Sequence, residues 1–80
     1  MNNSEYTPGP WHVAPMSPTW VGTKYSEHIA STDTFDIEDE DEQKANARLI
    51  AASPTMYAYL AELAKRGDVR AAAIVEAVHA

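Results

Sequence analysis

Carboxylates form the densest set of chemically active side chains in this sequence. Seven acidic residues fall within ten positions: Asp33, Asp36, Glu38, Asp39, Glu40, Asp41 and Glu42. A calcium loop that starts at Asp36 does not fit, because glycine is missing from its sixth position and glutamate from its twelfth. A looser magnesium or calcium site, a solvated loop whose last acids stabilise a helix N-terminus, and a docking strip for a basic protein surface stay open. We predict no metal ligands here and favour the last two interpretations.

Other catalytic or ligand-binding patterns are thin. The histidines, His12, His28 and His79, lack the short spacing that zinc sites use. The sequence holds no cysteine for thiol chemistry, and its glycines are too scattered for a phosphate-binding loop. We therefore expect no enzymatic activity and no cofactor.

The charge of the chain is distributed unevenly along its length. The net charge is −6, with nine acids and one base in residues 1–43, and five bases and three acids in residues 44–80. Nucleic-acid binding needs clustered basic residues, so this distribution argues against direct contact with DNA or RNA. No apolar run approaches the roughly 18 residues of a membrane span, and no signal pattern opens the chain. We expect a cytoplasmic protein that is not bound to a membrane.

Aromatic residues could add binding energy to the acidic strip. Trp20 and Tyr25 lie in a segment rich in proline, glycine and serine, where we expect them to be exposed. Tyr59 falls on the opposite side of its predicted helix from the leucines. Exposed aromatic side chains often dominate the energy of protein interfaces. We therefore predict a partner-binding set made of Asp33, Asp36, Glu38, Asp39, Glu40, Trp20, Tyr25 and Tyr59.

The elements that must position these residues differ between the two halves of the chain. A Pro-Gly-Pro turn precedes short strand-like runs at 11–14, 19–21 and 28–32, with a possible fourth at Phe35 and Ile37. Residues 40–79 show helical periodicity instead. The fold class is therefore α+β, a small antiparallel sheet or hairpin packed on two to three helices. We expect a single domain over 1–80, with a flexible 1–6, a β-rich 7–38 and a helical 40–79.

Local signals divide the helical half into three predicted helices. Asp39 can cap a helix over 40–52, and Ser53 followed by Pro54 is typical of a new helix start. Gly67 and Asp68 should end that second helix and cap a third over 69–79. We expect two apolar stripes to be buried with Trp11, Val13, Ile29 and Phe35: Ala45, Leu49 and Ala52, then Met56, Leu60 and Leu63.

Two further segments are TPGPW at 7–11 and ANARLIAASP at 45–54. In these segments the chain resembles a family of small phage and prophage proteins, which open with a TPGPW-like segment and close with an NARLIAAAP-like helix. The resemblance implies that the matching positions maintain the fold: Pro8, Gly9, Pro10, Trp11, Asn46, Arg48 and Leu49. We expect Asn46 to hydrogen-bond back to the TPGPW turn. The Thr55-Met56-Tyr57 continuation departs from the leucine-rich pattern of the family.

The resemblance implies a phage or prophage accessory protein in a bacterial host. We expect it to be non-enzymatic and to bind a host or phage protein through its acidic surface. By analogy with other small acidic phage proteins, inhibition of a bacterial defence system is the specific role that we favour. Two alternatives stay open: sequestration of a nucleotide signal by converging Arg48, Lys65, Arg66 or Arg70, and a structural or virion-associated protein that self-assembles as a homo-oligomer.

Overall fold

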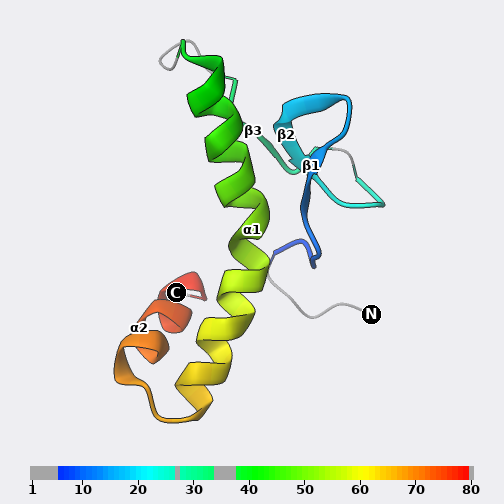
Figure 1. Cartoon of the computed structure of the whole chain (residues 1–80). Helices are drawn as coiled ribbons and strands as arrows, with labels where there is room; N and C mark the ends of the chain where they lie inside the picture. Colours follow the sequence, from blue (N-terminus) through cyan, green and yellow to red (C-terminus); the bar gives the residue numbers. More distant parts are fainter. Residues whose placement is uncertain (1–5, 27, 34–37, 80) are drawn as a thin grey trace.

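In the part of the chain that the structure describes, three short strands precede two helices (Figure 1). The structure, a computed structural model, describes residues 6–26, 28–33 and 38–79. The sheet lies beside the N-terminal half of α1 (Glu40–Lys65), and α2 (Val69–Val78) lies beside its C-terminal half. This arrangement confirms the predicted α+β class. The proposed fourth strand at Phe35 and Ile37, and the site residue Asp36, lie outside the described residues.

The sheet is antiparallel, in the order β1 (His12–Ala14), β2 (Ser17–Gly22), β3 (Ala30–Ser31). β1 and β2 form a tight hairpin, in which Val13 pairs with Val21 and Ala14 pairs with Ser17. The register jumps between these two pairs, and Pro18 lies in the irregular stretch, where a missing backbone N–H is tolerated. β2 begins at Ser17, two residues before the start of the strand predicted at 19–21. β3 covers two residues and is shorter than the strand predicted at 28–32.

The sheet packs on α1 through small and completely buried side chains. Val21 of β2 and Ala47 of α1 are both 0% exposed. The buried Thr32, just after β3, joins the two layers, because its hydroxyl lies 3.2 Å from the carbonyl oxygen of Thr19 and 2.6 Å from that of Gln43. A helix can approach a sheet this closely only where its facing residue is small, as Ala47 is.

α1 runs without a break through Pro54, so the predicted division into two helices at Ser53 and Pro54 is wrong. Proline has no N–H to donate to the carbonyl four residues earlier, which here belongs to Ile50. The Ser53 hydroxyl donates to that same carbonyl at 2.6 Å. The Ser-Pro pair therefore supplies its own replacement bond, and the two halves form one helix about 39 Å long.

The predicted burial along α1 is wrong for four of the six stripe residues, whereas Leu60 and Leu63 are half-buried. Ala45 and Ala52 are exposed, and Leu49 and Met56 are 62% and 43% exposed. The buried side of the N-terminal half carries Gln43 and Ala47 instead. The reason is the rotation of α1: the sheet and α2 cover neighbouring sides of the helix and leave the stripe with Leu49 uncovered.

The connection between the helices follows its predicted chemistry. Gly67 has a φ of 98°. Its backbone N–H donates to the carbonyl of Ala64, and the backbone N–H of Asp68 donates to the carbonyl of Leu63. These two bonds are the Schellman arrangement that ends a helix. The Asp68 carboxylate then accepts from the amide of Ala71 and caps α2. α1 and α2 consequently form a helical hairpin.

Within the described residues, neither helix is long and apolar enough to cross a membrane.

Candidate protein-interaction surface

The acidic end of the molecule is the N-terminus of α1. Five consecutive residues, Glu38 to Glu42, are all exposed. Asp39 is the helix cap, and its carboxylate accepts from the amide of Asp41 at 2.9 Å. In the described part of the chain, none of the five carboxylates is paired with a basic side chain. A concentrated negative field at the end of a helix can steer and hold a basic protein surface.

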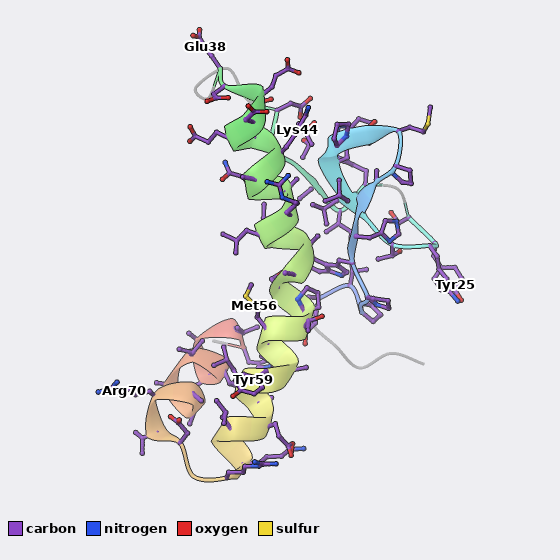
Figure 2. The ribbon with its side chains drawn as sticks, viewed as in Figure 1. Tyr25, Glu38, Lys44, Met56, Tyr59 and Arg70 are labelled. Carbon is purple, nitrogen blue, oxygen red and sulfur yellow. The ribbon has the colours of Figure 1, made fainter. Side chains whose placement is uncertain are left out.

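The predicted partner-binding residues do not form one patch (Figure 2). Glu38 lies at one end of α1, Tyr25 at the far edge of the sheet region, and Tyr59 on the second half of α1. The helical rise places Tyr59 about 28 Å from Glu40. Asp33 is exposed just after β3. Whether any of these residues binds a partner stays a prediction.

The aromatic candidates differ in exposure. Tyr25 is 88% exposed, and the Lys24 ammonium lies 5.1 Å from its ring centre. Tyr59 is 66% exposed, which confirms the accessibility that its helix position predicted. Trp20 is half-buried, and its ring centre lies 4.8 Å from that of His28. The expectation of an exposed Trp20 is therefore wrong, because His28 and the neighbouring strands cover part of it.

The carboxylates do not converge on an ion site. Among the residues that the structure describes, no three His, Asp or Glu side chains come together as metal ligands would. The acids follow one another along the start of α1, where successive side chains point in different directions. The arrangement presents charge outward instead of enclosing a cation.

The two segments of the family resemblance meet in space. A Cβ added to Gly9 would lie 3.1 Å from the Cβ of Pro54, so the TPGPW turn rests directly on α1. The indole N–H of Trp11 closes the turn by donating to the carbonyl of Thr7 at 3.0 Å, and the Gly9–Pro10 peptide is cis. Asn46, two helical turns before Pro54, makes no hydrogen bond to this turn among the described residues, so the link expected of it is wrong.

An apolar groove of about 430 Å³ lies beside this junction. The TPGPW turn forms one side, and α1 and α2 form the others. Its lining residues are Tyr6, Trp11, Ser53, Pro54, Met56, Tyr57, Leu60, Ile74 and Val78. Sequence reasoning missed the groove because it assigned Met56 and Leu60 to a closed core. Pro54 was the signal in the sequence that could have indicated the groove, because the TPGPW turn packs against α1 at this proline.

An aromatic cluster joins both ends of the described chain to the middle of α1. The Tyr57 hydroxyl and His79 Nε2 lie 2.5 Å apart, within hydrogen-bond distance. The Tyr6 ring centre lies 5.7 Å from that of Tyr57 in an edge-on arrangement. These contacts hold the first described residue and the end of α2 against one helix.

The basic residues of the nucleotide-binding alternative are spread along the helices. Arg48 is exposed on the N-terminal half of α1, about 25 Å along the helix from Lys65. Arg70 projects from the start of α2, away from α1 (Figure 2). None of these residues lines the apolar groove. Within one chain Arg48 therefore does not converge with Lys65.

Comparisons with known proteins identify the origin of the chain and no reaction. No curated protein and no solved structure matches it. A family described as Salmonella phage P22 protein Y8K6 matches residues 1–80, the whole length of the sequence. The chain therefore belongs to this family of small phage proteins.

Proposed function

We propose that this phage protein is a non-enzymatic accessory protein that binds a host or phage protein with a basic surface, in the cytoplasm of the bacterial host. Inhibition of a bacterial defence protein is the specific role that we propose for it. One observation carries the proposal: five adjacent and exposed carboxylates gather at the end of a long helix, and within the described residues none of them is paired with a basic side chain.

The helix itself does not need all of this charge. One capping carboxylate and an acid in the first turn are enough to satisfy and stabilise a helix N-terminus. Asp39 is the cap, and Glu40, Asp41 and Glu42 follow in the first turn. Glu38 adds a fifth exposed carboxylate just before the cap. Since Asp39 is the one that makes the capping hydrogen bond within the described residues, we propose Glu38 and Glu40 for the contact with a partner.

The apolar groove supports a binding role. Its lining holds tyrosine, tryptophan, proline and aliphatic side chains with one serine, Ser53. A groove of this composition can bury apolar side chains of a partner protein.

Charge reversal tests the proposal. The protein carrying Glu38→Lys with Glu40→Lys is compared with a matched control that carries Glu62→Lys with Glu76→Lys, since all four acids are exposed and both changes alter net charge equally. Each protein is immobilised and incubated with host lysate at low and high salt, and the retained proteins are identified by mass spectrometry. We expect one partner that wild type and control retain, that high salt releases, and that the acidic-end variant loses.

Two results would contradict the proposal: no partner held by the wild type, or a partner held equally by the acidic-end variant. Thermal unfolding of each variant provides the folding control. Lysine in the first turn of a helix is expected to destabilise it by roughly 0.3–1 kcal/mol per residue, which a folded domain tolerates. If the partner is found, its activity is measured in the presence of the wild type and of the acidic-end variant. The inhibitory role predicts that the wild type lowers this activity and that the variant does not.

A further inference from the structure

One apolar stripe of α1, which the sheet and α2 leave largely exposed, repeats with the spacing of a coiled-coil seam. We name it the α1 seam, and its members are Ala45, Leu49, Ala52, Met56, Tyr59 and Leu63. Successive members are four, three, four, three and four residues apart, which is the a/d heptad pattern. Leu49 and Tyr59 are 62% and 66% exposed, and only Leu63 is half-buried. The single chain therefore leaves a helix-pairing surface open to water.

The chain exposes more surface than a compact protein of the same mass. The chain exposes 6180 Å², whereas a compact protein of 8.8 kDa exposes about 4,800 Å². Its radius of gyration is 14.4 Å, against about 11.6 Å for a compact chain of this length. A standard interface removes about 800 Å² from each partner. The excess, about 1,400 Å², is large enough to supply such an interface.

The composition of the seam identifies the partner as a second copy of this chain. We infer that two copies pair through their α1 seams in antiparallel orientation, around a two-fold axis near Pro54. This axis places Ala45 against Leu63, Leu49 against Tyr59, and Ala52 against Met56 of the other copy. Two of these three layers set a small residue against a large one, and each layer joins an a position to a d position, as antiparallel helix pairs require.

The charges at the two ends of the seam favour the same orientation. Glu42 extends the heptad pattern by one position at the start of α1, and Arg66 extends it by one position at the end. The two-fold axis brings Glu42 of each copy opposite Arg66 of the other. Parallel pairing would instead set Glu42 against Glu42 and Arg66 against Arg66, which is repulsive. Opposite charges at both ends therefore specify antiparallel pairing.

The inference does not depend on the proposed function, because the seam binds a second copy of the chain and engages Glu42, whereas the test of the proposed function changes Glu38 and Glu40. Pairing leaves Glu38 and Glu40 outside the seam, at opposite ends of the dimer.

Sedimentation equilibrium of the full-length protein over a range of concentrations tests the pairing. We expect the mass to rise from 8.8 kDa to twice that value. Leu49→Glu should raise the dimer Kd by about tenfold or more, because it buries an unpaired charge in each of two symmetric layers. The matched control is Val69→Glu, which changes an 81% exposed apolar residue outside the seam and should leave the Kd unchanged. A wild type that stays monomeric at high concentration, or equal effects of the two variants, would overturn the inference.

Charge exchange and cross-linking test the orientation. Glu42→Arg and Arg66→Glu should each weaken the dimer, and the double variant should recover most of the loss. Since the sequence has no cysteine, Ala52→Cys and Met56→Cys can be made as separate single variants. Their equimolar mixture should form a disulfide-linked dimer, because the two positions face each other. Cross-linking of each single variant with itself, without the mixed disulfide between the two variants, would show parallel pairing and contradict the inference. Far-ultraviolet circular dichroism checks that each variant is folded. The lysate experiment described under the proposed function can fail without affecting these dimerisation results.

Discussion

The two faces of α1 differ in a way that the hydrophobicity of their residues does not explain. The face toward the sheet is closed by Ala47, which is 0% exposed, whereas the opposite face leaves Leu49 62% exposed. Close approach of a strand requires a small helical side chain, so alanine is buried and the larger leucine is not. The comparison teaches that burial in this small domain is decided by which neighbour can approach the helix, and that the face with Leu49 is the one left for association.

The largest expected effect on the packing between the sheet and α1 comes from a larger side chain at Ala47. Ala47→Leu should destabilise the protein by about 2 kcal/mol, because a completely buried site has no room for three more carbon atoms. Urea denaturation at low protein concentration measures the change. Ala45→Leu, on the exposed face, is the matched control and should leave the unfolding free energy almost unchanged. Equal losses at the two positions would show that the faces are not distinct.

Thr32 tests the polar link across the same interface. Thr32→Val keeps the shape of the side chain but removes the hydroxyl that lies within hydrogen-bond distance of the carbonyls of Thr19 and Gln43. We expect a loss of about 1.5 kcal/mol in the free energy of unfolding. Thr32→Ser retains the hydroxyl and should lose less. A Val variant as stable as wild type would indicate that packing alone holds the sheet on α1.

Gly9 probes the contact where the TPGPW turn rests on the helix. Gly9→Ala places a methyl carbon 3.1 Å from Pro54, whose ring the helix holds in place. We expect a loss of about 1 kcal/mol, as for mild overpacking. Thermal unfolding provides the measurement. A stabilised variant would show instead that lower entropy of the unfolded chain outweighs the contact.

The smallest expected effect concerns the hydrogen bond from the Ser53 hydroxyl to the carbonyl of Ile50, which replaces the backbone bond that Pro54 cannot make. Ser53→Ala removes the hydroxyl donor to Ile50 and should cost about 0.5 kcal/mol. In a Pro54→Ala background the backbone donor returns, so Ser53→Ala should then be neutral. A double-mutant cycle in chemical denaturation measures this coupling. Additive effects of the two changes would contradict the compensation.

The fold class and the helix ends could be predicted because they depend on local chemistry. Asp39, Gly67 and Asp68 act where their side-chain or backbone preferences place them. The break at Pro54 was mispredicted because Ser-Pro is equally compatible with a helix start and with a compensated interior. The contacts of Gly9 and of the helices decide between these outcomes, and they are not local.

The candidate site was less predictable than the fold. The density of acids at the start of α1 follows directly from the sequence, and so does the exposure of Tyr59. The rotation of α1 about its own axis does not, because two stripes of similar hydrophobicity compete for the sheet. Ala47 and Val21 fit together closely, and that fit places Leu49 and Met56 on the outside.

The contacts among Tyr6, Tyr57 and His79 have a practical consequence for anyone who attaches a label to this protein. Tyr6 and His79, the first and last residues that the structure describes, both contact the Tyr57 ring of α1. A bulky group attached at either residue would therefore disturb the other one and the apolar groove, which Tyr6 and Tyr57 line. A label at the exposed Lys24 would leave these contacts undisturbed.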